Sequence, residues 1–177
     1  MKLTSMVLTL ACALALTGCS SLLSLNPFVT DDQAAADSAL IGTWTDSQDG
    51  SVYVIRQDGK AYAITYTDGS SPAAKFEARL LKAGDAELLD LVSANDDPFQ
   101  IPAHLIVRVW TDGSTMRWAF LDSDWFKQLA AQQLAVQASG DRKLITAPGE
   151  AVRQFLLKWG ADDRAYDKPT ALQKSVF

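Results

Sequence analysis

The sequence predicts a mainly β protein, an antiparallel meander that closes into a barrel of about eight strands, with two amphipathic helices in the C-terminal third. The first observation behind this fold class is that short apolar runs alternate with Asp-Gly dipeptides, which begin at Asp49, Asp58, Asp68 and Asp112. Glycine in such pairs supplies the positive φ angle that tight hairpin turns need. The second observation is that pairing residues across these turns separates an apolar face from a mixed one. Closure into a barrel would remove the exposed sheet edges.

Seven strands follow from the runs between turns. Their expected bounds are 40–46, 51–57, 60–67, 74–83, 86–93, 104–111 and 114–122. A two-residue loop at Asp112-Gly113 predicts three apolar pairs on one face: Val109 with Met116, Val107 with Trp118, and Leu105 with Phe120. The same loop places Arg108 opposite Arg117 on the other face. Like charges there cost a few tenths to about 1 kcal/mol, so acidic neighbours, stacking on Trp110 or an anionic ligand should offset them.

An aromatic face is the candidate ligand site. A loop at Asp58-Gly59 pairs Ile55 with Tyr62 and Tyr53 with Ile64. The residues expected to point into the barrel are Tyr53, Tyr62, Tyr66, Phe76, Trp118 and Phe120. An eight-stranded barrel is just wide enough either to be filled by its side chains or to hold a small ligand. The bulk of these rings favours a filled core, whereas their polar groups are typical of ligand pockets.

Beyond residue 122 the period changes from two to that of a helix. The run from Trp125 predicts an amphipathic helix to about Ser139, with Gly140 as its stop, and 143–146 could be one more strand. A second helix follows from apolar residues at i, i+3, i+4 and i+7 between Val152 and Trp159. We expect this helix to lie against the barrel wall or to close one end. Residues 161–177 read as a polar, loosely held tail.

A family resemblance rests on the first strand. Leu40-Ile41-Gly42-Thr43-Trp44 resembles the Gly-x-Trp motif that opens the first strand of lipocalins and related barrels. The resemblance implies a lipocalin-like (calycin-type) barrel over residues 39–160. It also implies that Gly42 and Trp44 are structural rather than ligand-binding.

The N-terminus carries a second resemblance. One charge at Lys2 precedes an apolar run that is too short to span a bilayer, which is typical of a secretory signal. The run ends in Leu16-Thr17-Gly18-Cys19, which resembles the lipobox of bacterial lipoproteins. The resemblance implies cleavage of a signal peptide of residues 1–18 and a diacylglyceryl group on Cys19. Ser20 after the cysteine suggests an outer membrane location facing the periplasm.

Residues 19–38 are therefore expected to be a lipidated tether. Its apolar residues either lie on the lipid surface or pack against the folded domain: Leu22, Leu23, Leu25 and Phe28. With Cys12 removed and Cys19 acylated, no thiol remains for a disulfide. Two or three acyl chains would make the attachment to the membrane lasting.

Composition argues against several other functions. The formal net charge of −5 disfavours nucleic acid as a partner. A single histidine, His104, cannot build a multi-histidine zinc site, and no Gly-x-Ser-x-Gly elbow is present, so we expect no enzyme, no metal and no cofactor beyond the lipid on Cys19. Acidic residues at 95–97 and 122–124 read as a turn and a helix cap rather than calcium ligands.

Two hypotheses of function remain. The first is an anchored barrel that binds a lipid or another small apolar molecule. The second is an interaction lipoprotein whose filled barrel docks a protein partner in the envelope, through Trp110 or through the 94–103 connection with Phe99 and Ile101. An open apolar cavity would favour the first hypothesis, and a solid core the second.

Overall fold

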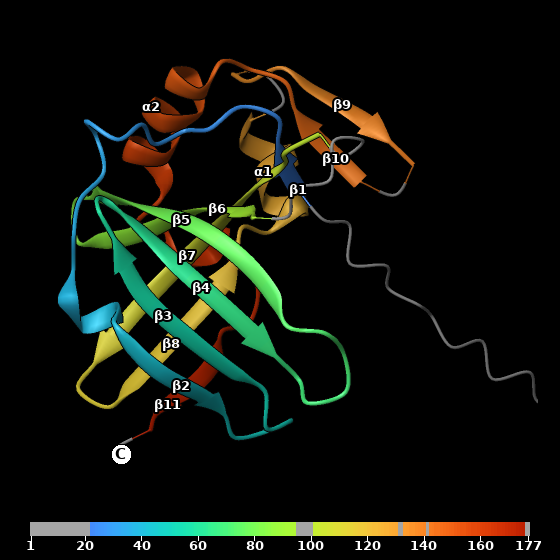
Figure 1. Ribbon diagram of the computed structural model, residues 1–177. Helices are drawn as coiled ribbons and strands as arrows, with labels where there is room; N and C mark the ends of the chain where they lie inside the picture. Colours follow the sequence, from blue (N-terminus) through green and yellow to red (C-terminus); the bar gives the residue numbers. More distant parts are fainter. Residues whose placement is uncertain (1–21, 95–100, 131–132, 141, 176–177) are drawn as a thin grey trace, which may run out of the picture.

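The computed structural model of the chain describes residues 22–94, 101–130, 133–140 and 142–175. Its centre is a closed antiparallel barrel of eight strands (Figure 1). Seven of them follow one another along the chain: β2 (Gly42–Asp46), β3 (Val52–Asp58), β4 (Ala61–Thr67), β5 (Ala74–Ala83), β6 (Ala86–Ser93), β7 (His104–Asp112) and β8 (Thr115–Phe120). The fold class and all seven predicted strands are confirmed.

The eighth strand, β11 (Thr170–Lys174), closes the barrel by pairing with β2 on one side and β8 on the other. The expectation of a loosely held tail over 161–177 is therefore wrong for this segment. Leu172 is the reason, because it is 1% exposed and points into the barrel from a strand whose other residues are polar or small. A single buried side chain in five residues is too weak a pattern to predict a strand.

Two of the three short hairpin turns, at Gly59 and Gly113, lie one residue later than the sequence predicts, whereas the turn at Gly84 lies between the predicted strands 74–83 and 86–93. Gly59, Gly84 and Gly113 each occupy the first central position of a two-residue turn, with φ angles of 59°, 63° and 57°. Glycine at that position is typical of the type II′ hairpin turn, so each preceding residue still belongs to its strand. Val109 thus pairs with Trp118 instead of Met116. A slip of two residues keeps every side chain on its predicted face, because the strand period is two.

The new register also separates Arg108 from Arg117. Arg108 pairs with Ala119, and Arg117 with Trp110, so the expected like-charge pair is wrong. Both guanidinium groups lie over the Trp110 ring, at 4.6 and 5.4 Å from its centroid. Arg108 also forms an ion pair with Asp163 at 2.7 Å. Aromatic stacking and a carboxylate therefore stabilise these cations.

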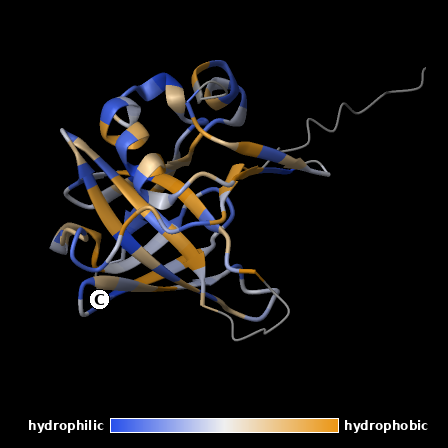
Figure 2. Ribbon diagram, turned by 90° about the horizontal axis from the view of Figure 1, so that it is seen from above, coloured by the Kyte–Doolittle hydropathy of each residue, from blue (hydrophilic) through white to orange (hydrophobic). Residues whose placement is uncertain are grey.

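A second layer covers the outer face of β5 to β8. It consists of β1 (Leu22–Ser24), α1 (Ser123–Ala130), β9 (Val136–Ser139), β10 (Arg142–Ile145), α2 (Gly149–Trp159) and η2 (Asp163–Ala165). Both helices lie on one side of the barrel (Figure 1). Each helix contains both hydrophobic and hydrophilic residues (Figure 2). Buried residues therefore form two clusters, one inside the barrel and one between its outer wall and this layer. The expectation that α2 packs on the barrel wall is confirmed.

The first helix is shorter than predicted. It ends at Ala130, and residues 136–139 form strand β9, whose four residues are all exposed. β9 pairs with β10 in a hairpin across Gly140, which has a φ of 62°. Residues 136–139 form a strand because they pair with β10, so their conformation depends on a contact with another segment and not on their own sequence pattern.

The segment after β1 packs against the domain instead of lying free. Phe28 and Val29 are each 1% exposed, and their backbone amides donate to Asp90 Oδ2 at 2.8 and 3.1 Å. The segment also passes so close to the start of α2 that a Cβ on Gly149 would lie 1.8 Å from the Pro27 carbonyl oxygen. All residues of both buried clusters lie at or beyond Leu22. The chain from Ser20 onward thus contains every described residue of the two cores.

One end of the barrel is closed and the other is not. The closed end has the three short hairpins and the turn η1 (Ser38–Leu40). There Trp44, fully buried, donates from Nε1 to the Leu40 carbonyl at 2.9 Å, and Lys174 lies over its ring. Gly42 has a φ of 147°, and a Cβ there would meet the Lys174 side chain at 2.7 Å. The opposite end, which we call the mouth, carries the long connections 47–51, 68–73, 94–103 and 121–169.

Candidate ligand-binding cavity

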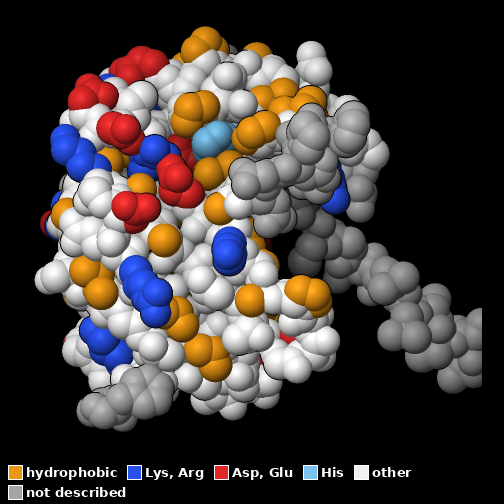
Figure 3. Space-filling view, in the orientation of Figure 1, with side chains coloured by type: hydrophobic (Ala, Val, Ile, Leu, Met, Phe, Trp, Pro, Cys, Tyr) orange, Lys and Arg blue, Asp and Glu red, His pale blue; other side chains and the backbone are white. Residues whose placement is uncertain are grey.

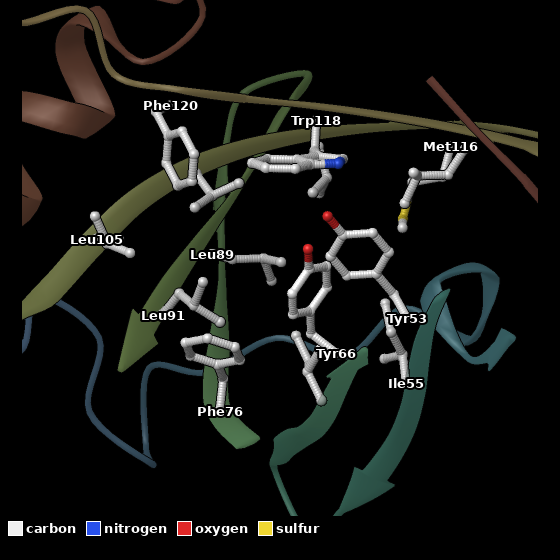
Figure 4. Close-up of a pocket in the computed structure, with 14 residues that line it drawn as sticks. Tyr53, Ile55, Tyr66, Phe76, Leu89, Leu91, Leu105, Met116, Trp118 and Phe120 are labelled. Carbon is white, nitrogen blue, oxygen red and sulfur yellow. The ribbon is translucent and has the colours of Figure 1, made fainter. Parts of the chain in front are cut away.

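The barrel encloses a cavity of about 230 Å³. All seven strands that line it contribute apolar or aromatic side chains (Figure 4). The residues are Tyr53, Ile55, Ile64, Tyr66, Phe76, Leu89, Leu91, Leu105, Val107, Val109, Met116, Trp118, Phe120 and Leu172. For scale, an engineered apolar cavity of about 150 Å³ binds benzene. The barrel is therefore not filled by its own side chains.

An aromatic cluster occupies the mouth half of the cavity. The Tyr53 ring lies 5.0 Å from the Tyr66 ring and 6.0 Å from the Trp118 ring, between centroids. Trp118 and Phe120 meet edge to face at 4.9 Å and 87°. Edge-to-face contacts of this kind stabilise aromatic pairs beyond the burial of their area. These rings therefore pack against one another along one side of the cavity.

Five of the six predicted pocket residues line the cavity. The exception is Tyr62, which is 1% exposed and lies near the closed end. Its hydroxyl donates to the Asp37 carbonyl at 3.1 Å and accepts from the Asp37 amide at 2.6 Å. This pair of hydrogen bonds ties η1 across the barrel end. The strand pattern places Tyr62 on the correct face but contains no information on its depth along the barrel axis.

Three aliphatic lining residues were absent from the predicted sets of inward-facing residues. Leu89 and Leu91 alternate in β6, a signal of period two that could have identified them. Leu172 lies in the unpredicted strand β11. Gly42 and Trp44 do not line the cavity and belong to the closed end.

The cavity surface carries no charge. None of its described lining residues is ionised at neutral pH, and the accessible surface of the cavity is almost entirely apolar, because the polar atoms of Tyr53, Tyr66 and Trp118 contribute almost nothing to it. Burial raises the pKa of the Tyr53 phenol above its usual value, so this group stays protonated at physiological pH. The Trp118 Nε1–H is buried and has no hydrogen-bond partner in the part of the chain that the structure describes.

Solvent reaches the cavity from the mouth. Tyr53, Tyr66, Phe76, Leu91 and Phe120 are partly exposed, whereas lining residues deeper in the barrel such as Val107 and Met116 are 3% exposed. Ile101, in the connection between β6 and β7 at the same end, is 78% exposed. The mouth is therefore the end at which the cavity opens to solvent.

The other candidate residues have structural partners. His104 is buried, and its Nδ1 lies 2.6 Å from Asp90 Oδ1. Asp122 caps α1 by accepting from the amides of Asp124 and Trp125. Within the described ranges no group of three or more His, Cys, Asp or Glu side chains is arranged to hold a metal ion. The acidic run 95–97, Phe99 and Cys19 lie outside the described residues.

Two other hollows in the described part of the surface are lined by polar or charged side chains together with apolar ones. On the face in Figure 3, acidic side chains gather in one region, and basic ones are scattered among hydrophobic and polar groups. Trp110 is half-buried against Tyr166, with ring centroids 6.2 Å apart, so it is not an exposed patch. None of the described helices has the length and hydrophobicity needed to cross a bilayer.

The fold and the cavity define a closed β-barrel with an uncharged, accessible interior. Comparison of the chain with models of known families, with curated proteins and with solved structures gave no match. The functional argument therefore depends on the residues of this chain alone.

Proposed function

We propose that this protein is a lipid-anchored binding protein of the bacterial envelope, which holds a small apolar ligand inside a lipocalin-like barrel. The single observation that carries this proposal is the cavity of about 230 Å³, which is apolar and open at the mouth. Pockets that are mostly apolar with a few convergent polar groups are typical of small-molecule sites. A filled barrel that serves only to dock a protein partner would leave no such space. A catalytic role is not part of the proposal.

The anchor in this proposal is a diacylglyceryl group on Cys19, with the protein on the periplasmic side of the outer membrane. Cys19 precedes the first described residue, Leu22, by three positions. Three extended residues span at most about 11 Å, so the anchor would hold the domain close to the bilayer.

The position of β1 indicates which end of the barrel would face the lipid. Ser24 pairs with His104 at the start of β7, and the adjacent Leu105 lines the cavity near the mouth. From there the chain crosses the outer wall and reaches the closed end at Leu40. The anchored N-terminal segment therefore joins the domain at the mouth end. An apolar ligand could then pass between the bilayer and the cavity over a short distance.

The anchor is tested by labelling cells with a radioactive fatty acid. The wild-type protein is expected to carry the label and to fractionate with membranes, and Cys19→Ala to lose the label completely, because only the thiol forms the thioether. Cys12→Ala, which changes the other cysteine, should leave the labelling intact. An unlabelled wild-type protein, or a labelled Cys19→Ala variant, would contradict this half of the proposal.

The ligand site is tested with the uncharged fluorescent probe N-phenyl-1-naphthylamine. The chain from Ser20 onward, exported behind a signal peptide without a lipobox, is expected to bind one probe molecule with enhanced emission, because the probe enters an apolar environment. Titration by fluorescence gives the stoichiometry. Absence of saturable binding to folded protein would contradict the proposal and favour the interaction hypothesis.

A further inference from the structure

The cavity extends from the mouth toward the closed end of the barrel. Leu105, Val107 and Val109 all line it along β7, which runs from the mouth to the hairpin with β8. Leu105 and Met116 lie at opposite ends of the lining side chains (Figure 4). The four residues from Leu105 to Val109 advance about 13 Å along the strand, which a strand tilt of about 40° reduces to about 10 Å along the barrel axis. This distance is the depth of the cavity.

Three side chains form the inner end of the cavity, which we call the floor: Val109, Met116 and Leu172. Each of them is at most 3% exposed. Val109 is the innermost lining residue of β7, Met116 is the innermost of β8, and Leu172 pairs with Met116. Beyond the floor the fully buried Trp44 belongs to the closed end. A ligand that enters at the mouth is therefore stopped by the floor.

The volume of the cavity matches one short hydrocarbon chain. An apolar cavity of about 150 Å³ binds benzene, which has six carbon atoms, so by proportion this cavity holds about nine. An extended chain of nine carbons is about 10 Å long, because its bonds of about 1.5 Å advance in a zigzag. The depth and the volume therefore agree with a single extended chain, and two chains side by side exceed the volume.

The polar end of such a molecule has no place inside the barrel. No Lys, Arg, His, Asp or Glu side chain is among the described lining residues, and the accessible surface of the cavity is almost entirely apolar. Burial of a polar or charged group there would remove its hydration without replacement. At the mouth, where the cavity opens to solvent, the same group keeps its water. The apolar end of the ligand is therefore the end that is buried.

We propose that the cavity binds the tail of a single-chain amphiphile, with the methyl end against the floor and the polar head at the mouth, and that the floor limits the buried length to about nine carbons. The proposal rests on the proposed function, because it names the ligand class of the same cavity. It makes Val109, Met116 and Leu172 the residues that determine which chain lengths are bound in full.

The test is isothermal titration calorimetry of the chain from Ser20 onward with alkyl β-D-glucosides from hexyl to dodecyl, each below its critical micelle concentration. The association constant is expected to rise about fourfold for each added methylene, because each one is transferred from water into the cavity. This rise should stop at about nine carbons, because further methylenes remain outside the cavity. A rise that continues without a break to the dodecyl glucoside would overturn the inference.

A variant of the floor tests the limit directly. Val109→Phe points a larger group into the free space above the floor, and its side chain has four more carbon atoms than valine. The break in the series should therefore move down by about three carbons, while the hexyl glucoside still binds and shows that the variant is folded. The matched control is Val54→Phe, which makes the same change on the outer face of β3 and should keep the break of the wild type.

The remaining outcomes separate this inference from the proposed function. If Val109→Phe binds the hexyl glucoside and keeps the break of the wild type, the floor does not limit the chain and the inference is wrong. If Val109→Phe does not fold, the wild-type series decides by the presence or absence of its break. If no glucoside binds while N-phenyl-1-naphthylamine does, the inference is wrong and the binding function stands. If that probe does not bind either, the proposed function fails instead.

Discussion

Asp90→Ala is expected to lower the free energy of unfolding by about 3–5 kcal/mol. The Asp90 carboxylate is 3% exposed and satisfies three groups, the amides of Phe28 and Val29 and the His104 ring. Alanine would leave both amides and the ring nitrogen buried without partners. Urea denaturation followed by circular dichroism measures the loss.

Two variants serve as controls for Asp90→Ala. Asp90→Asn keeps an oxygen that can accept from the amides and should cost less than Asp90→Ala. Asp85→Ala removes a carboxylate from an exposed turn and should change stability by no more than about 0.5 kcal/mol. A loss below about 1 kcal/mol for Asp90→Ala would show that the N-terminal segment is not held as described.

Leu91→Trp is expected to abolish binding of N-phenyl-1-naphthylamine to the chain from Ser20 onward. Leu91 lines the cavity and is partly exposed near the mouth, so a larger side chain can occupy the free space there. Added volume in a packed core usually costs about 1–3 kcal/mol, and the open space around Leu91 should keep the cost near the lower figure. Fluorescence titration measures the binding, and thermal unfolding confirms that the variant is folded.

The matched control for this variant is Ala63→Trp, which places the same side chain on the exposed outer face of β4. It should bind the probe as the wild type does. Equal affinity of Leu91→Trp and Ala63→Trp for the probe would place the ligand outside the barrel.

The barrel could be predicted because the alternation of apolar and polar residues can be recognised within each strand and its neighbouring turn. Alternation in β3, β4, β7 and β8 identifies the inward face, and that face survives the two-residue error in register. The register was wrong because Asp58 and Asp112 still lie in their strands, so that Gly59 and Gly113 take the first turn position. The aromatic lining followed from the same alternation.

The outer layer could be predicted only in part: its two helices and the strand at 143–146 follow from local patterns, whereas β1 and β9 depend on pairing with other segments. β1 pairs with β10 and β7, more than 70 residues away, and β9 is a strand only by pairing with β10. The hydrogen bond from the Phe28 amide to the Asp90 carboxylate joins residues that are 62 positions apart. The burial of the Trp118 nitrogen, which has no hydrogen-bond partner among the described residues, is likewise a property of the assembled barrel.

The most direct test of the central claim is the indole N–H signals of the five tryptophans, followed by nitrogen-15 NMR while methyl octanoate is added to the chain from Ser20 onward. Each signal is assigned by a Trp→Phe variant. The account predicts that the Trp118 signal shifts in a saturable manner and that the signal of Trp44, at the closed end, changes little. Saturable shifts confined to tryptophans of the outer layer, with Trp118 unchanged, would contradict a ligand site inside the barrel.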